Sequence, residues 1–304
     1  MKILYLGLMT NSVGFTTAMR KHATEYQQVN CGGNNFNLEA TRVASQFKPD
    51  LVFIQIQTPN IIAIETVIFL KKNGAFIINW TGDCRNPIPQ WYYDIGHYID
   101  LTCFSNMVDV KQFRTDGLKS EYLEIGYDPE IYKPQGEKLT IRDIVFLGNN
   151  YGDGFFPEST YRREMVEFLK YHYPHDFGLY GNGWTTSMGD FNGSQPEEAK
   201  LLRGAKIAIN LSHFNYERYN SDRILRIMGT GVMCLTRRYE GLKEDFDAGI
   251  HLGVWDNLDE LKTNIDYYLN NEAERVEIAN KGHELMLKSF TYDEMIKNII
   301  NLVK

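Results

Sequence analysis

Short apolar runs of strand length alternate with amphipathic segments in the first part of the chain. Between the runs, apolar residues recur every three or four positions, which is the spacing of one helix face, over 15–26, 38–47, 61–72 and 108–114. A strand followed by a helix, repeated, predicts βαβ units and a mostly parallel sheet. The expected strands are 3–8, 28–31, 51–57, 75–80, 101–104 and 121–124.

The pattern breaks at 126–136, where prolines and glycines cluster, and a second series of the same kind follows. Its expected strands are 143–148, 177–180, 207–211 and 232–236, its expected helices are 161–171, 196–203 and 222–228, and the spacing beyond 251–254 is helical. This order predicts an α/β fold of two Rossmann-like domains facing across a cleft, with a helical C-terminal tail. The expected domains are 1–138 and 139–289, with the last helix, 290–304, packing back on the first domain.

Charge, cysteines and apolar stretches restrict the class of protein. The 304 residues carry a net charge of −7, which does not favour binding through nucleic-acid phosphates. The chain starts without a signal-peptide pattern, and its longest apolar stretch, 61–70, contains Glu65 and is too short to span a membrane. The four cysteines lie far apart and are expected to be buried, reduced thiols. These features predict a cytoplasmic protein.

Several sequence blocks resemble one enzyme family in the same order. They are NWTGDCR (79–85), IGYDPEIYKP (125–134), DIVFLGN (143–149), FGLYGNGW (177–184), AKIAINLS (205–212), SDRILRIMGTGVMCLT (221–236) and the helical stretch 258–296. In these blocks the chain resembles the small GT-B glycosyltransferases related to the spore maturation protein CgeB, which belong to the glycosyl transferases group 1.

The resemblance implies an enzyme that moves a sugar from a nucleoside diphosphate sugar, expected to be UDP-linked, to an acceptor. It implies that the C-terminal domain binds the nucleotide-sugar and the N-terminal domain binds the acceptor. It also implies that no cofactor or metal is required, because helix dipoles and arginines neutralise the charge of the diphosphate. The acceptor and the stereochemistry of transfer are left open.

Two glycine-containing turns of the second domain are candidate contacts for the nucleotide. Gly148 and Asn149 close its first strand, where a small residue lets backbone N–H groups approach a phosphate. Gly181 and Asn182 follow the next strand, and Trp184 is expected to stack on the nucleobase or to wall it off. The structural alternatives are an ordinary strand-to-helix turn and a buried core tryptophan.

The S-D-R block is the most specific candidate for diphosphate binding. The pattern predicts a helix over 222–228 with Asn220 or Ser221 as N-cap and Asp222 in its first turn. Its N-terminus would direct N–H groups at the diphosphate, and Arg223 would clamp it by bidentate hydrogen bonds as the glycosidic bond breaks. The alternative is a solvated arginine on a helix surface.

The chain departs from the related enzymes at two acidic positions. Many retaining GT-B enzymes carry two glutamates eight positions apart, and here Arg218 and Arg226 occupy those places. The second glutamate normally holds the donor ribose, so this role is expected to pass to Asp222, Glu217, Glu240 or backbone groups, or to be absent. The two arginines would then add contacts to phosphate.

Asp83 is the candidate catalytic group of the first domain. It follows the expected strand 75–80, on a loop at the carboxyl end of the sheet, where a general base would take the proton of the acceptor hydroxyl. A retaining enzyme would instead use a donor phosphate oxygen as base, and Asp83 would position the acceptor or serve only in a turn. Gly14, at the start of the first helix, is a further candidate for approach to the donor phosphates.

Other chemistries fit the sequence less well. Asp245 and Asp247 form a D-x-D tripeptide, and 172–176 holds two histidines and an aspartate, but we expect neither to bind a metal. No G-x-G-x-x-G fingerprint follows the first strand, which argues against a nicotinamide enzyme. Two alternatives to a glycan-type transferase stay open: a non-catalytic sugar-nucleotide-binding or surface-assembly protein, and a phage-type glycosyltransferase that modifies DNA bases.

Overall fold

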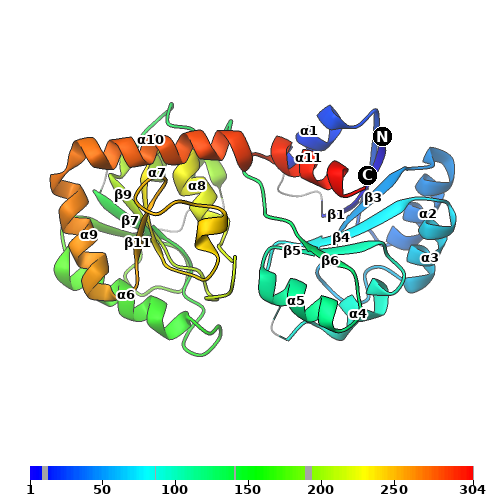
Figure 1. Ribbon diagram of the computed structural model, residues 1–304, viewed down its shortest axis with the longest axis horizontal. Helices are drawn as coiled ribbons and strands as arrows, with labels where there is room; N and C mark the ends of the chain where they lie inside the picture. The colour runs from blue at the N-terminus through cyan, green and yellow to red at the C-terminus, as the bar shows by residue number, and fades with distance from the viewer. Residues whose placement is uncertain (9–12, 86, 140–141, 189–193, 304) are drawn as a thin grey trace. The chain divides into compact units, whose positions relative to one another are not determined.

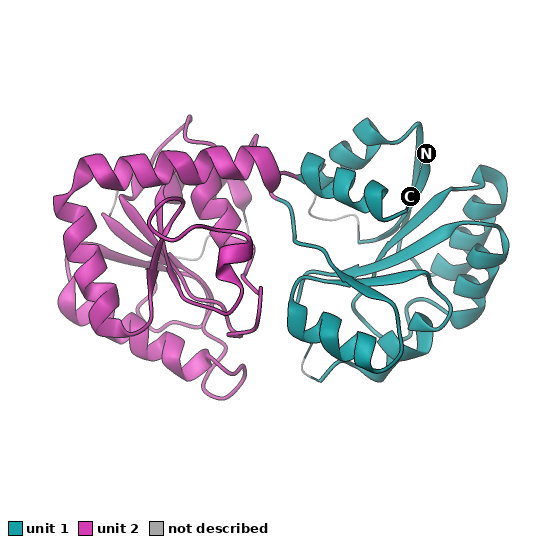
Figure 2. Ribbon diagram, in the orientation of Figure 1, with its two compact units in different colours: residues 1–126, 292–304 teal, residues 127–291 magenta. Residues whose placement is uncertain are grey.

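The computed structural model describes residues 1–8, 13–85, 87–139, 142–188 and 194–303. The chain forms two compact units (Figure 2), which are called unit 1 and unit 2 below. Unit 1 comprises Met1–Gly126 together with Tyr292–Lys304, and unit 2 comprises Tyr127–Thr291.

Unit 1 is a parallel sheet of six strands with helices on both faces (Figure 1). The strand order is β2-β1-β3-β4-β5-β6. The strands are β1 (Lys2–Gly7), β2 (Glu25–Asn30), β3 (Leu51–Gln55), β4 (Phe76–Thr81), β5 (Leu101–Phe104) and β6 (Ser120–Tyr122). The helices are α1 (Val13–His22), α2 (Phe36–Phe47), α3 (Ile64–Lys72), α4 (Gln90–Gly96), α5 (Met107–Thr115) and α11 (Tyr292–Leu302).

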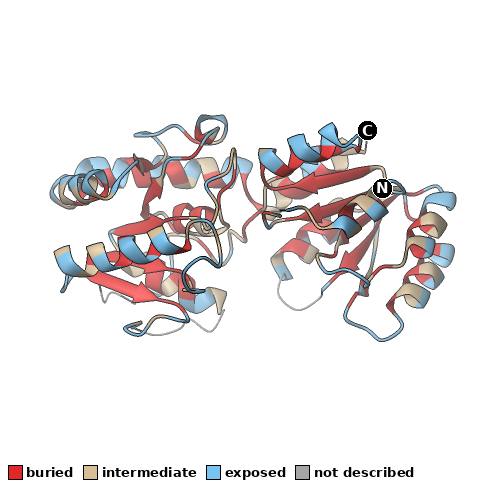
Figure 3. Ribbon diagram, turned by 90° about the horizontal axis from the view of Figure 1, so that it is seen from below, coloured by how far each residue is buried: buried red, intermediate tan, exposed pale blue. Residues whose placement is uncertain are grey.

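Alternation along the central strands builds a core on each face of the unit 1 sheet. In β3, Val52 and Ile54 pack with α2 and α3, while Leu51 and Phe53 pack with α1 and α11. Successive side chains of a strand point to opposite faces, so a strand covered on both sides must be apolar throughout. Figure 3 shows the strands as the buried layer of the fold.

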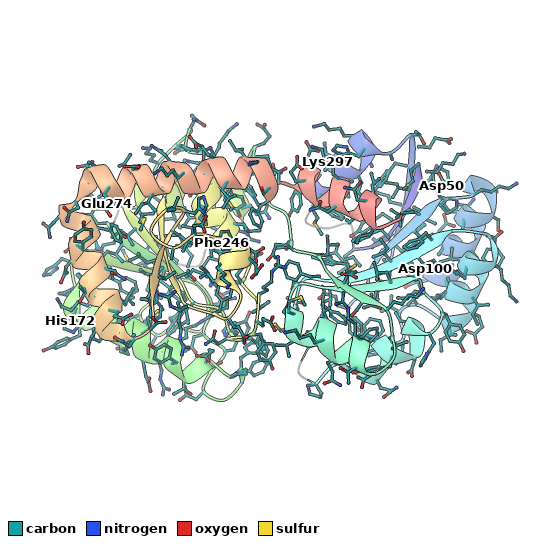
Figure 4. The ribbon with its side chains drawn as sticks, viewed as in Figure 1. Asp50, Asp100, His172, Phe246, Glu274 and Lys297 are labelled. Atoms are coloured by element: carbon teal, nitrogen blue, oxygen red, sulfur yellow. The ribbon has the colours of Figure 1, made fainter. Side chains whose placement is uncertain are left out.

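Two aspartates fix the amino ends of strands in unit 1, and both are labelled in Figure 4. Asp50 accepts a hydrogen bond from the backbone N–H of Lys2 at 2.7 Å, and Asp100 accepts one from that of Ile77 at 2.8 Å. The opposite, carboxyl edge of the sheet carries the loops that are free to vary in sequence.

The C-terminal helix α11 belongs to unit 1. Met295, Ile296 and Ile299 are buried in the core cluster that includes α1. Asp293 in its first turn pairs with Lys21 and His22 in the last turn of α1. Opposite charges placed at these helix ends also complement the helix dipoles.

Unit 2 has a parallel sheet of five strands in the order β11-β10-β9-β7-β8. Its strands are β7 (Ile144–Leu147), β8 (Phe177–Tyr180), β9 (Ile207–Asn210), β10 (Met233–Arg237) and β11 (Gly253–Trp255). Its helices are α6 (Ser159–His172), α7 (Gln195–Gly204), α8 (Arg223–Gly229), the 3₁₀ turn η1 (Leu242–Glu244), α9 (Leu258–Asn270) and α10 (Glu272–Ser289).

The segment that follows Gly126 packs into unit 2. Tyr127 and Tyr132 are buried, and the hydroxyl of Tyr132 donates to Glu198 of α7 at 2.7 Å. The compact units therefore divide at 126/127 and 291/292, whereas the sequence pattern predicts divisions at 138/139 and 289/290. A proline-rich segment lacks periodicity, so the pattern does not reveal which core buries its tyrosines.

Candidate functional site

The strand order of unit 2 has a switch point between β7 and β9. The chain proceeds outward from β7 to β8 on one side and from β9 to β11 on the other, so the order reverses between these two strands. Ligands of such sheets bind at this switch point, beyond the carboxyl ends of the strands. Here those ends are Gly148 with Asn149 and Leu211 with Ser212.

Arg223 lies at this switch point. From the first turn of α8 its guanidinium donates to the carbonyl oxygen of Leu147 and, at 3.2 Å, to that of Leu211. Further donations reach Asn210 Oδ1 at 3.3 Å and Ser221 Oγ at 3.2 Å. A side chain at Gly148 would meet Arg223 Nη2 at 3.0 Å, so glycine there leaves room for the guanidinium.

Arg162 of α6 joins Arg223, although the sequence did not single it out. Its side chain is 2% exposed. The guanidinium donates to Leu211 O at 2.5 Å and Asn149 O at 3.2 Å, and it lies 2.5 Å from His213 Nε2. A signal was present in the sequence, because Arg162 occupies an apolar-face position of α6, in spacing with the buried Met165, Val166 and Leu169.

The two arginines form a cationic site without a bonded carboxylate. All the hydrogen bonds of Arg162 and Arg223 within the described chain go to carbonyl, amide, hydroxyl or imidazole groups. Both guanidinium carbons lie over the ring of Phe146, at 5.6 and 5.2 Å from its centre. Partly buried positive charge of this kind is costly unless an anion is bound.

Burial is the main cause of the pKa shifts in this site. Burial, reinforced by the charge of Arg223, lowers the pKa of Arg162 to about 8. Burial also lowers the pKa of Arg223. For His213, burial and then the two arginines lower the pKa to about 3, so its imidazole is neutral at physiological pH. A bound dianion would oppose each of these shifts.

Hydrogen bonds join the loops after β7 and β8. Asn149 Oδ1 accepts from the N–H of Asn182 at 2.9 Å, and the N–H of Asn150 donates to Asn182 O at 2.9 Å. Gly181 and Gly183 have φ of 131° and 80°, and a Cβ at either would overlap a carbonyl oxygen of the β7 loop. Both glycines are therefore required by close approach as well as by conformation.

Trp184 is anchored to the same loop. Its indole Nε1–H donates to Gly148 O at 2.7 Å, and its partly buried ring packs against the core of unit 2. This packing is the structural role given above as the alternative for Trp184, although the ring is only partly buried.

The start of α8 differs in detail from the sequence prediction. The helix spans Arg223–Gly229, and its N-cap is Asp222, whose side chain makes no capping hydrogen bond. The prediction of Asn220 or Ser221 as N-cap is wrong. Ser221 instead donates through its hydroxyl to Asn210 Oδ1 at 3.2 Å, and its N–H donates to Ser212 Oγ at 3.0 Å.

The arginines at the two acidic positions both pair with carboxylates. Arg218 donates to both oxygens of the buried Asp245, at 3.1 and 2.6 Å. Arg226 donates to Glu198 at 3.0 Å and to Asp222. Arg218 and Arg226 are thus each hydrogen-bonded to a carboxylate within unit 2, whereas Arg162 and Arg223 are bonded to none.

Glu217 and Glu240, the proposed substitutes for the missing acids, lie close to Arg218. The carbonyl oxygen of Glu240, whose side chain is exposed, accepts from the N–H of Arg218 at 2.7 Å. Glu217 is half-buried and directly precedes Arg218 in the loop before α8.

A small hollow lies beside Leu211, whose carbonyl oxygen accepts from both arginines. Glu158 and Arg237 form an ion pair in its wall, and Arg237 also lies over the ring of Tyr161, 4.3 Å from its centre. Leu211 and Ser212 line the side nearest Arg223.

In unit 1, Asp83 lies at the carboxyl edge of the sheet, just beyond β4. Its side chain is 65% exposed, and Oδ2 is 3.5 Å from Arg85 Nη2. Its backbone N–H donates to Thr81 Oγ1 at 3.3 Å. Gly14 is half-buried in the first turn of α1, and the preceding positions 10–12 of the predicted loop lie outside the described residues.

No cluster of His, Cys, Asp and Glu suited to a metal occurs among the residues that the structure describes. In the D-x-D tripeptide, Asp245 pairs with Arg218 and Asp247 is exposed.

Among the helices of the described ranges, none combines the length and apolar content needed to cross a bilayer. All four cysteines are buried free thiols.

Comparison with known proteins identifies the fold. Residues 162–301 match the family model described as glycosyl transferase-like. No curated protein sequence matches the chain. Among solved structures, Anabaena Alr3699/HepE in complex with UDP and glucose has a TM-score of 0.68 at 10% identity, over 100% of this chain and 99% of its own.

Two further structures extend the likeness. Sucrose-phosphate synthase from Thermosynechococcus elongatus has a TM-score of 0.65 at 10% identity, covering 99% of this chain and 98% of its own. The lipopolysaccharide outer core galactosyltransferase WaaB has a TM-score of 0.61 at 11% identity, covering 100% and 99%. The predicted GT-B fold is confirmed, and the glycosyl transferase-like match over 162–301 supports a glycosyltransferase.

Proposed function

We propose that this chain is a CgeB-like glycosyltransferase that moves a sugar from a UDP-sugar to an acceptor hydroxyl. The observation that carries the proposal is the pair of guanidiniums, Arg162 and Arg223, at the switch point of unit 2 without a bonded carboxylate. A nucleoside diphosphate is the anion that sugar transfer releases, and its charge grows as the glycosidic bond breaks.

The two arginines have distinct roles in this proposal. Arg223 is partly exposed and binds the diphosphate directly, with the backbone of Gly148 and Asn149 alongside. Arg162 is buried, so it raises the positive potential and holds the carbonyl groups of Asn149 and Leu211 in place. Fixed charges of this kind need no reorganisation when the leaving group forms.

The remaining donor contacts follow the loops joined at β7 and β8. Asn182 and the exposed part of Trp184 face the nucleobase, and Ser221 and Asp222 lie beside the diphosphate and ribose. Arg218, Arg226 and Glu240 orient the segment around the start of α8 and do not bind phosphate. Arg218 and Arg226 act through their ion pairs with Asp245 and Glu198, and Glu240 acts through its backbone contact with Arg218. UDP is favoured as the nucleotide because the fold is shared with a protein whose structures hold UDP and UDP-glucose.

The reaction exchanges one bond to the anomeric carbon for another. The acceptor oxygen bonds to that carbon, the bond to the β-phosphate oxygen breaks, and UDP leaves with the bonding electrons. The hydroxyl proton passes to Asp83 in an inverting reaction, or to a donor phosphate oxygen in a retaining one. Arginines supply the charge neutralisation, so no metal is assigned a role.

Four reduced cysteines favour a reducing compartment, and we propose a cytoplasmic location.

The test is release of UDP from a panel of UDP-sugars, with GDP- and TDP-sugars for comparison. We expect release from at least one UDP-sugar and its loss in Arg223→Ala. Binding of UDP-sugar without release under all acceptor conditions would instead identify a non-catalytic sugar-nucleotide-binding protein. Absence of binding to every nucleotide would refute the proposal.

A further inference from the structure

A second polar cluster surrounds Arg85 at the carboxyl edge of the unit 1 sheet. The side chain of Arg85 is 20% exposed, and its Nη2 donates to Gln57 Oε1 at 2.8 Å and Thr81 Oγ1 at 3.2 Å. The ring of Tyr92 lies 5.8 Å from the guanidinium carbon. Loops after β3 and β4 thus hold one arginine in a fixed position at the edge where ligands of parallel sheets bind.

Carboxylates flank this arginine on two sides. Asp83, largely exposed, lies 3.5 Å from it. The buried Asp109 of α5 accepts from the backbone N–H of Arg85 at 3.0 Å and from Asn106 Nδ2 at 2.7 Å. Burial raises the pKa of Asp109. The cluster therefore has no excess positive charge, in contrast to the arginine pair of unit 2.

This charge distribution selects the chemistry of the ligand. An anionic group at Arg85 would also meet the like charge of Asp83, which is unfavourable. A pair of hydroxyl groups both donates and accepts hydrogen bonds, so it matches a carboxylate acceptor beside a guanidinium donor. Both hydrogen bonds that the Arg85 side chain donates within the described chain come from Nη2, so the Nη1 group retains donor capacity.

We infer that the Asp83–Arg85 pair binds the acceptor as a neutral carbohydrate through vicinal hydroxyl groups. Asp83 accepts from the hydroxyl that is glycosylated, Arg85 donates to its neighbour, and Gln57 holds Arg85 in orientation. This inference rests on the proposed function and adds the substrate class. It disfavours duplex DNA as acceptor, because the cluster offers no site for backbone phosphates.

The first experiment compares acceptors with the full-length chain. UDP release from UDP-glucose, UDP-galactose and UDP-N-acetylglucosamine is measured with methyl glycosides of neutral hexoses, with the corresponding sugar phosphates and uronic acids, and with duplex DNA. We expect neutral sugars alone to stimulate release. Stimulation by anionic sugars or DNA in preference to neutral sugars would overturn the inference, as would a panel in which no neutral sugar acts.

Variants of Arg85 then test its role in acceptor binding. Arg85→Gln should lower kcat/KM for the neutral acceptor by about 10- to 100-fold, the loss expected for one charge-assisted hydrogen bond, with UDP affinity retained. Arg85→Lys keeps the charge but loses the planar fork, and should be intermediate. The exposed Arg42→Gln in α2 is the matched control and should transfer at the normal rate. Wild-type acceptor kinetics in Arg85→Gln would overturn the inference.

Two controls keep the interpretation clear. Thermal unfolding of each variant reports whether the fold is intact, and Arg85→Lys remains informative if Arg85→Gln unfolds. If the wild-type chain does not bind UDP, the proposed function itself is refuted. Retained UDP binding with unchanged acceptor selectivity in the Arg85 variants would refute only the acceptor assignment.

Discussion

Arg162 and Arg223 donate to the same carbonyl oxygen, that of Leu211, at 2.5 and 3.2 Å. Two guanidiniums with one shared acceptor are held close together despite their like charge, by α6 on one side and α8 on the other. Each therefore gains more from a bound diphosphate than an isolated surface arginine would.

Arg223→Ala should weaken UDP binding by about 10- to 100-fold, because a charge-assisted contact to phosphate is lost. Turnover should fall further, since charge on UDP increases as the bond breaks. Titration calorimetry gives the affinity and UDP release gives the rate. Arg238→Ala, which removes an exposed arginine of unit 2, is the control. Equal affinities in the two variants would remove Arg223 from the donor site.

Asp83→Asn should reduce transfer by about 100-fold if the carboxylate takes the acceptor proton. UDP affinity should stay unchanged, because Asp83 belongs to unit 1 and the donor contacts belong to unit 2. Asp94→Asn, at an exposed position of α4, is the control. A full transfer rate in Asp83→Asn would exclude Asp83 as the base.

Gly183→Ala should destabilise the joined loops more than Gly152→Ala. Both glycines have positive φ, 80° and 88°, so alanine at either costs about 1 kcal/mol of backbone strain. Only at Gly183 would the new Cβ overlap a carbonyl oxygen, that of Asn150, while at Gly152 nothing lies within 4 Å. Thermal unfolding and UDP affinity should both separate the two variants. Equal effects would mean that the loop contact adjusts freely.

Arg226→Glu restores the residue type of related enzymes and should nevertheless destabilise this chain. The new carboxylate would face Glu198 and Asp222, which now share Arg226. Loss of a partly buried pair with added repulsion should cost about 3 kcal/mol in the free energy of unfolding. Urea unfolding measures it. A double variant, Arg226→Glu with Glu198→Gln, should recover part of the loss.

His213 should make the fold sensitive to acid. The unfolded chain protonates this imidazole below its ordinary pKa of 6.5, whereas the folded chain keeps it neutral down to about 3. The unfolded state then binds more protons, so stability falls as the pH drops from 6.5 towards 3. His213→Gln should reduce this dependence of the melting temperature on pH, and the same change at the exposed His175 is the control. An unchanged slope in His213→Gln would contradict the assignment.

The sequence predicts the order of elements well because apolar periodicity records burial in each element separately. It misses the start of β2, where Glu25 and Gln27 precede the apolar residues, since this edge strand alternates exposed and half-buried positions. The sequence predicts Arg223 as a site residue because it lies in one continuous block, S-D-R at 221–223. The meeting of Arg162 with Arg223 and the contact between Gln57 and Arg85 depend on residues brought together from separate elements, which periodicity does not encode.

The isolated β-bridge between Tyr127 and Thr291 joins the first and the last residue of unit 2. The two points where the backbone leaves and re-enters unit 1 lie next to each other, and a Cβ on Gly126 would be 2.9 Å from the Cα of Tyr292. Unit 2 is therefore an insertion whose ends already meet. A gene that joins residues 126 and 292 through a short linker, and another that encodes 127–291, should each yield a complete sheet with its covering helices.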